Sequence, residues 1–166
     1  MSKSDVSQGN CPIARVMELL GEGWTLLILR EAFLGTRRFN DFERELGVAR
    51  NILSIRLKKL VEAGLLERKP SASDRRVVEY RLSDTGKSLF PVLVALTQWA
   101  GQCLCDDSEP VRFIERASGD EIAPVTVHNR KGEPLGLHDI AMVAGPGADK
   151  QLRERYERVM KRVEAA

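Results

Sequence analysis

The chain has 166 residues, of which 43% are hydrophobic and 30% are charged, and its formal net charge is +2. This composition predicts a folded globule. No apolar run reaches the roughly 18 residues of a membrane span, and no apolar signal segment follows the N-terminus. The three cysteines are too few for a disulfide framework, so we expect a cytoplasmic protein.

The first part of the chain predicts two helices after a small polar N-terminus of residues 1–10. Cys11-Pro12 opens the first helix, because proline is tolerated in a first turn. Its buried stripe repeats at helical spacing and comprises Ile13, Val16, Met17 and Leu20. After Gly21–Gly23, the segment Trp24–Leu34 is apolar on nearly all sides, which predicts a central buried helix.

The next stretch predicts a helix-turn-helix. A short helix covers Asn40–Leu46, where Asn40 and Glu43 have the spacing of a capping box. A turn follows at Gly47–Ala49, and a longer helix runs over Arg50–Ala63 before Gly64 ends it. On the longer helix, leucines share one face and polar residues share the opposite face, as helical spacing requires.

A hairpin with a basic loop follows. The strands are Leu65–Lys69 and Val77–Leu82, joined by the loop Pro70–Arg76. Alternation in the second strand predicts that Val78, Tyr80 and Leu82 face the core, while Glu79 and Arg81 face solvent. Between Arg50 and Arg81 nine basic residues stand against four acidic ones, so positive charge is concentrated on this stretch. Helix, turn, helix and basic wing together predict a DNA-binding module.

The rest of the chain predicts a long helix and a small extension. The helix Asp84–Leu104 contains Pro91 near its start, which is either tolerated there or kinks the helix. Beyond it, Val111–Glu115 and Ala123–His128 look like strands, with a turn at 129–132 and a charged terminal helix Asp149–Ala166. The fold class is therefore α+β: a winged helix-turn-helix domain (residues 11–105) with flanking dimerisation helices, and a C-terminal strand-helix extension (residues 106–166).

Candidate DNA contacts follow from how helix-turn-helix proteins dock. The N-terminal part of the second helix reaches base edges in the major groove, where asparagine can pair with adenine, lysine with guanine, and an apolar side chain with the thymine methyl. The predicted base contacts are Asn51, Ser54, Ile55 and Lys58. The predicted contacts to phosphates, or to the minor groove from the wing, are Arg37, Arg38, Arg50, Arg56, Lys59, Arg75 and Arg76.

Several of these features together resemble the HxlR family of bacterial winged helix-turn-helix transcriptional regulators. The shared features are Cys11-Pro12, Gly23-Trp24, Arg38-Phe39, Leu53, Arg56-Leu57, Leu60, Gly64-Leu65, Arg68, Val78–Leu82 and Thr85-Gly86. The resemblance implies a homodimer that binds double-stranded DNA at a palindromic operator, with Arg50–Ala63 as the recognition helix. The wing sequence Ser73–Arg76 is instead similar to the MarR family, whose members bind DNA in the same way.

Cys11 is a candidate redox sensor. In some members of the HxlR family, a cysteine at this position senses quinones, aldehydes or oxidants, and thiols at helix N-termini ionise more readily than free ones. The opposing interpretation is an ordinary cysteine at the start of a helix.

Other kinds of function have less support. The chain contains no phosphate loop, no nucleophile elbow and no glycine-rich dinucleotide turn, so we expect neither an enzyme nor a cofactor. Cys103, Cys105, His128 and His138 lack the spacing of a zinc site, so no metal is predicted. Two alternatives stay open: a MarR-like regulator that senses a small aromatic effector at its dimer interface near Trp24 and Trp99, and a winged-helix module that binds proteins.

Overall fold

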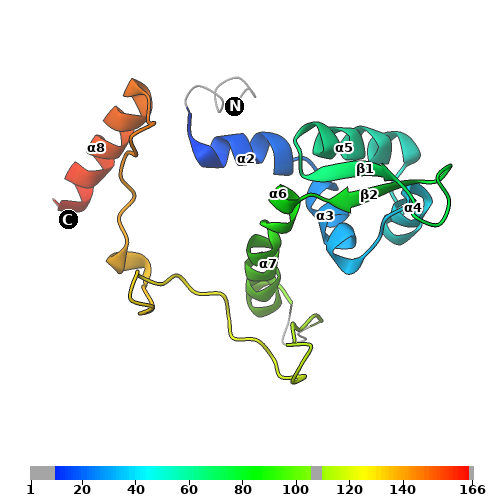
Figure 1. Ribbon diagram of the computed structural model, residues 1–166. Helices are drawn as coiled ribbons and strands as arrows, with labels where there is room; N and C mark the ends of the chain where they lie inside the picture. Colours follow the sequence, from blue (N-terminus) through cyan, green and yellow to red (C-terminus); the bar gives the residue numbers. More distant parts are fainter. Residues whose placement is uncertain (1–9, 106–109, 165–166) are drawn as a thin grey trace. The chain divides into compact units, whose positions relative to one another are not determined.

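The computed structural model describes residues 10–105 and 110–164 (Figure 1). The chain divides into two compact units, one formed by residues 23–126 and the other by residues 1–22 and 127–166. This division groups the first helix with the C-terminal extension, whereas the sequence predicts that helix in a domain of residues 11–105. The predicted domain assignment stays a prediction.

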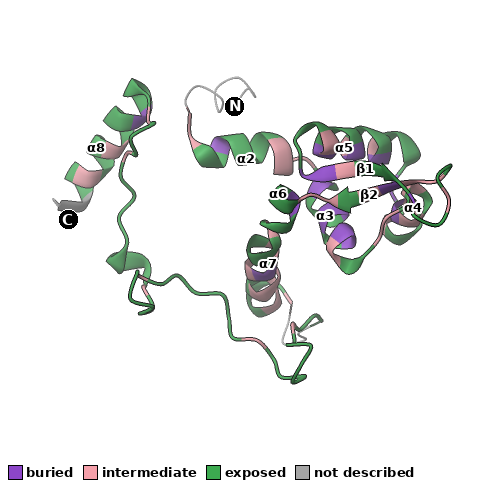
Figure 2. Cartoon of the chain, viewed as in Figure 1, coloured by how far each residue is buried: buried purple, intermediate pink, exposed green. Residues whose placement is uncertain are grey.

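Within the larger unit, residues 25–82 form three helices and a hairpin. Helices α3 (Thr25–Leu34), α4 (Phe39–Leu46) and α5 (Arg50–Glu62) pack with the antiparallel strands β1 (Leu66–Pro70) and β2 (Val78–Leu82). This order confirms the predicted winged helix-turn-helix. Its largest fully buried side chains come from the three helices and β1 (Figure 2), and they are Ile28, Leu29, Phe42, Leu53, Leu57, Leu60 and Leu66.

Helix α3 has one buried face rather than the fully buried surface predicted from its sequence. Ile28 and Leu29 lie in the core, but Leu26 and Leu27 on the other side reach solvent in the single chain. The helix begins one residue later than predicted, because Trp24 has a left-handed φ of 74° and acts as the N-cap.

Helix α4 begins at Phe39 and not at the predicted capping box. Arg38 is the N-cap residue and provides no side-chain hydrogen bond. Asn40 consequently lies inside the first turn, so the predicted capping box between Asn40 and Glu43 is wrong. The start of the helix is set instead by a β-bridge between Arg38 and Glu79, which holds the preceding segment in an extended conformation.

The wing hairpin pairs Leu66 with Leu82 at its base and Pro70 with Val78 at its far end. The prediction that Glu79 faces solvent is wrong, because its exposed fraction is only 8%. The segment before α4 covers this side of β2, where the backbone N–H of Tyr80 donates to the carbonyl of Arg37 at 2.7 Å. Hydrogen bonds from Ser71 and Arg81 lower the pKa of Glu79, so the covered carboxylate stays ionised.

The predicted long helix after the wing is broken into α6 (Asp84–Lys87) and α7 (Phe90–Cys103). Ser83 caps α6 by accepting from the Gly86 N–H at 2.9 Å. Pro91 lies in the first turn of α7, where its missing N–H leaves no partner unsatisfied. A continuous helix would have placed that proline in an interior turn, which explains the break.

The smaller unit contains α2 (Pro12–Leu20), the 3-10 turn η1 (Leu137–Asp139) and α8 (Lys150–Glu164). Helix α2 starts directly after Cys11, as predicted. Helix α8 confirms the terminal helix up to residue 164, and the last two residues of the predicted range lie outside the described part.

The predicted strands of the extension do not form. Over residues 110–136 the described chain shows two isolated β-bridges, Ile114 with Glu121 and His128 with Pro134. Each bridge closes a tight hairpin, and the predicted turn at 129–132 is present, with Gly132 at a φ of 85°. The residues are extended, but no third strand lies beside either hairpin to continue a ladder.

Candidate DNA-binding surface

Helix α5 turns one face to the core and the opposite face to solvent. Its three fully buried residues are Leu53, Leu57 and Leu60. All four predicted base-contacting residues are exposed, and they are Asn51, Ser54, Ile55 and Lys58. Ile55 is 49% exposed, so it contributes little to the core and is free to contact another molecule.

Arg50 links the start of α5 to α4 through side-chain contacts. Its guanidinium donates to the Glu43 carboxylate at 2.5 Å and lies over the Phe39 ring, with 4.8 Å between the guanidinium carbon and the ring centroid. A longer contact of 3.5 Å joins it to Asn40 Oδ1. The sequence predicts that Arg50 binds phosphate. The contacts of Arg50 with Glu43 and Phe39 could not be predicted, because no local sequence pattern links residues on opposite sides of the turn.

Arg37 and Arg38 lie between α3 and α4, beside the first residues of β2. The backbone of each pairs with β2 through the Tyr80 N–H and the Glu79 bridge. The positive charge of Arg38 also contributes to the lowered pKa values of Glu79 and Asp74. Arg38 therefore balances one carboxylate of β2 and one of the wing loop, and its side chain is exposed.

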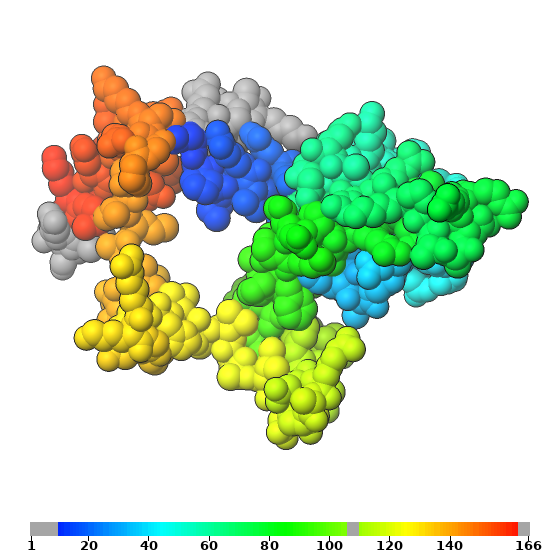
Figure 3. All heavy atoms as spheres, viewed as in Figure 1, coloured from blue at the N-terminus to red at the C-terminus, as the bar shows by residue number. Residues whose placement is uncertain are grey.

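The wing loop projects from the larger unit and carries two arginines of different character (Figure 3). Arg76 folds back on Asp74, with side-chain hydrogen bonds of 3.2 and 3.1 Å that lower the pKa of this carboxyl. Arg75 is exposed and has no partner among the described residues. The tip thus presents one unpaired cation and one that Asp74 partly neutralises.

The remaining cations of α5 are not equally available. Arg56 is half-buried, Lys59 is exposed, and both interact with other groups of the chain. Lys58 approaches Glu62 at 3.7 Å on the exposed face, a spacing of one helical turn. Exposed pairs of this kind hold their partners weakly, so Glu62 holds Lys58 only loosely.

Cys11 is half-buried at the N-cap position of α2, and its side chain makes no capping hydrogen bond. Cys11, Cys103 and Cys105 are free thiols. The described residues contain no group of three or more histidine, cysteine or acidic side chains that could hold a metal ion. None of their helices is long and apolar enough to cross a bilayer.

A helix-turn-helix whose second helix has an exposed polar face, followed by a hairpin whose loop carries arginines, defines a winged helix-turn-helix protein. The chain belongs to the HxlR-like helix-turn-helix family, which matches residues 19–108. It is accordingly an HTH-type transcriptional regulator and not an enzyme. The match decides between the two families that the wing sequence left open.

Relatives with the same organisation include an uncharacterized HTH-type transcriptional regulator of Mycobacterium tuberculosis, Rv3095, which is 40% identical over 84% of this chain and 89% of its own. The crystal structure of PA1607, a proposed transcription factor, is 40% identical over 85% of this chain and 99% of that one, with a TM-score of 0.78. The reduced form of the regulator YodB from B. subtilis is 29% identical over 59% of this chain and 97% of that one, with a TM-score of 0.50. The first two relatives therefore extend into the C-terminal region, and YodB does not cover it.

Proposed function

We propose that the protein binds specific DNA sequences as a homodimer, with α5 of each subunit in a major groove and the wing loop on the adjacent backbone or minor groove. The observation that carries the proposal is the exposed face of α5, where Asn51, Ser54, Ile55 and Lys58 stand opposite a fully buried leucine face. Three of these four side chains are polar or charged, so this face would be unfavourable to bury in the core.

Phosphate contacts would come from exposed cations, chiefly Arg75, Lys58 and Lys59, together with the half-buried Arg37. If a dimer neutralises about eight phosphates, the logarithm of the binding constant should fall with the logarithm of salt concentration with a slope of about −7. Fluorescence anisotropy with a labelled operator between low and physiological salt measures this slope. A slope near zero would instead favour the alternative function, a winged-helix module that binds proteins.

Base recognition is tested separately from charge. Asn51→Ala should relax the preference at one operator position at a cost of about 1–3 kcal/mol, because asparagine loses its paired hydrogen bonds to adenine. Arg75→Ala is the matched control, which should weaken all sequences alike and flatten the salt slope. Equal losses on every sequence for both variants would contradict the assignment of Asn51 to a base.

Dimerisation is supported by apolar surface that the single chain leaves uncovered. On α7 the exposed residues include Phe90, Val92, Leu96 and Trp99, and on α2 they include Ile13 and Met17. Sedimentation velocity should find a dimer that Trp99→Glu weakens. Leu137→Glu is the control, because Leu137 is also exposed but lies in η1, outside these helices.

A homodimer with two recognition helices predicts a palindromic operator. Half-sites should lie about 34–36 Å apart, one turn of DNA, or a multiple of this distance. Selection of bound sequences from a random pool, at a stated salt concentration, would identify the half-site and its spacing. A single, unrepeated site would contradict the symmetric arrangement.

Cys11 is the residue that we propose for redox or electrophile control. A quinone would add to the thiolate, forming a carbon–sulfur bond while a quinone oxygen takes up a proton. Treatment with methyl-benzoquinone should change operator binding in wild type and in Cys103→Ser, which retains Cys11. If Cys11→Ser responds as strongly as wild type, the cysteine has no sensing role.

A further inference from the structure

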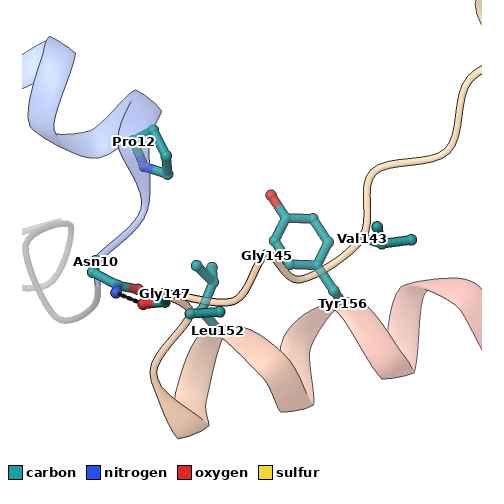
Figure 4. A pocket seen from close by; sticks show the side chains of 8 residues that line it. Asn10, Pro12, Val143, Gly145, Gly147, Leu152 and Tyr156 are labelled. Atoms are coloured by element: carbon teal, nitrogen blue, oxygen red, sulfur yellow. Dashed lines mark hydrogen bonds between the residues drawn. The ribbon is translucent and has the colours of Figure 1, made fainter.

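The smaller unit contains a pocket of about 330 Å³ between the start of α2, the loop of residues 143–148 and the first turns of α8 (Figure 4). We call it the glycine-loop pocket. Leu152 and Tyr156 project from α8 toward the loop, and Pro12 lies at the start of α2. All of these residues belong to one compact unit.

Polar contacts hold the walls of this pocket in place without filling it. Asn10 and Asp149 bond reciprocally, since each backbone N–H donates to the other side chain, at 3.0 and 3.2 Å. The Asn10 side-chain amide also donates to the carbonyl of Gly147. Arg153 donates to the carbonyls of Pro146 and Ala148 at 2.9 and 2.8 Å, so the glycine loop is fixed from both sides.

Gly145 and Gly147 line the pocket and lack side chains. A Cβ atom built on Gly145 or Gly147 meets no atom within 4 Å, and neither residue has a left-handed φ. A side chain is therefore tolerated at either position, and it would project into unoccupied space. Holding the walls while leaving the space open is the arrangement of a preformed binding site.

A second lobe of about 310 Å³ adjoins the pocket, because both share Val143 and Tyr156. Its lining adds Ala144, Arg153, Glu157, Met160 and Lys161. Lys161 has no partner among the described residues, and the two cations outnumber the single carboxylate of Glu157, so the charge of the lining is net positive. The shared wall of Val143 and Tyr156 is apolar and aromatic. This combination suits a molecule with an apolar body and an anionic group.

We propose that the glycine-loop pocket and its second lobe bind a small amphipathic organic anion, such as an aromatic carboxylate, as an effector of the regulator. The aromatic or aliphatic body would lie against Leu152, Tyr156 and Val143, and the carboxylate would pair with Lys161. The site lies in the smaller unit, between the start of α2 and the C-terminal extension, and it does not include Trp24 or Trp99.

The regulatory part of this inference rests on the proposed function, whereas binding itself does not. Pro12 and Asn10, which line the pocket, flank Cys11 at the start of α2. A bound molecule would contact the first turn of this helix. Four residues of chain connect α2 to α3, which is the first helix of the DNA-binding unit. Effector binding and Cys11 chemistry would thus act on the same helix end.

The test is an NMR titration of the ¹⁵N-labelled full chain with 4-phenylbutyrate, without DNA. The amides of Asn10, Gly147, Leu152 and Tyr156 should shift together and saturate. Gly147→Leu places a large side chain on a residue that lines the pocket and should abolish these shifts. Lys161→Gln should weaken binding by about fivefold, as expected for one exposed ion pair. Lys150→Gln is the matched control, because Lys150 lies on the same helix and does not line the pocket.

Two further measurements make each outcome decisive. The neutral analogue 4-phenylbutan-1-ol should bind wild type more weakly than the carboxylate does. In Lys161→Gln the two compounds should bind with equal affinity. Equal affinity of the two compounds for wild type would overturn the anion assignment. Shifts confined to α7, or unchanged in Gly147→Leu, would overturn the site. If Gly147→Leu separates a dimer in sedimentation, the occupant is a second copy of the chain and the effector proposal is wrong. Loss of DNA binding with the pocket titration intact would count only against the proposed function.

Discussion

Substitution of Arg50 by alanine separates two roles that one arginine at the start of a recognition helix can have. In the structure its guanidinium contacts Glu43 and the Phe39 ring, both on α4. We therefore expect Arg50 chiefly to fix the angle between α4 and α5. A phosphate ligand would instead leave the folded protein nearly unchanged when it is removed.

The size of the effect follows from the two contacts. The ion pair is largely open to solvent, since the side chains of Arg50 and Glu43 are 65% and 30% exposed, so it should contribute about 0.2–1 kcal/mol. A cation–π contact at an exposed site adds about 0.5–1 kcal/mol. Arg50→Ala should thus lower the free energy of unfolding by about 1–2 kcal/mol.

Urea denaturation followed by circular dichroism, at fixed protein concentration, measures this loss. Arg50→Lys should recover only part of the stability, because an ammonium keeps the charge but cannot stack as a planar group. A double-mutant cycle with Glu43→Gln should give a coupling energy within the range of an exposed ion pair.

DNA binding supplies the result that would refute this reasoning. If Arg50 contacts one phosphate in each subunit, Arg50→Ala should flatten the salt slope by about 1.8 and leave stability unchanged. If it positions the helix, operator affinity should fall with the slope preserved. Unchanged stability together with a flatter slope would show that Arg50 binds phosphate and that its contacts with α4 contribute nothing measurable.

Three further predictions concern folding. Leu57→Ala removes a fully buried side chain and should lower the free energy of unfolding, measured by urea denaturation, by about 2–5 kcal/mol. A much smaller loss would contradict the buried position of Leu57. Gly86→Ala should lower the melting temperature, although alanine favours helices, because a Cβ would lie 2.1 Å from the Leu65 carbonyl oxygen; an increase would contradict that contact. Hydrogen bonds from the backbone N–H groups of Leu152, Asn10 and Gln151 lower the pKa of Asp149 below its usual 3.8. Its stabilising contribution should therefore be complete above about pH 4 and be lost as pH falls through the lowered pKa, a dependence that urea denaturation should find absent in Asp149→Asn.

The helix-turn-helix was predictable because its signals are local and agree with one another. Leu53, Leu57 and Leu60 recur at helical spacing, and Gly64 ends the helix, so the bounds of α5 differ from the prediction by a single residue. The exposed position of Ile55 also follows from this periodicity. Base-contacting candidates could be named from sequence for the same reason, since helical spacing fixes which side chains share a face.

The errors arise where distant segments decide the outcome. Glu79 is covered because the segment at Arg38 lies against β2, a contact between residues far apart in the sequence. The same bridge moves the start of α4 and makes the capping-box pattern at Asn40 irrelevant. In the extension, Val111–Glu115 has the composition of a strand, but a strand also needs a partner beyond one bridged pair, which sequence pattern alone does not reveal.

The division into two units limits how control could reach DNA. Cys11 and the glycine-loop pocket both lie at the N-terminal end of α2, and the shortest path from this helix to the DNA-binding unit is Gly21–Trp24. Trp24 in this link holds a left-handed conformation that costs a bulky residue about 1–2 kcal/mol. Gly21 leaves no room for a side chain, because a Cβ there would lie 2.4 Å from the Met17 carbonyl oxygen. Rv3095 and PA1607 are similar to this chain over 84% and 85% of its length, so the similarity reaches beyond the helix-turn-helix into the extension.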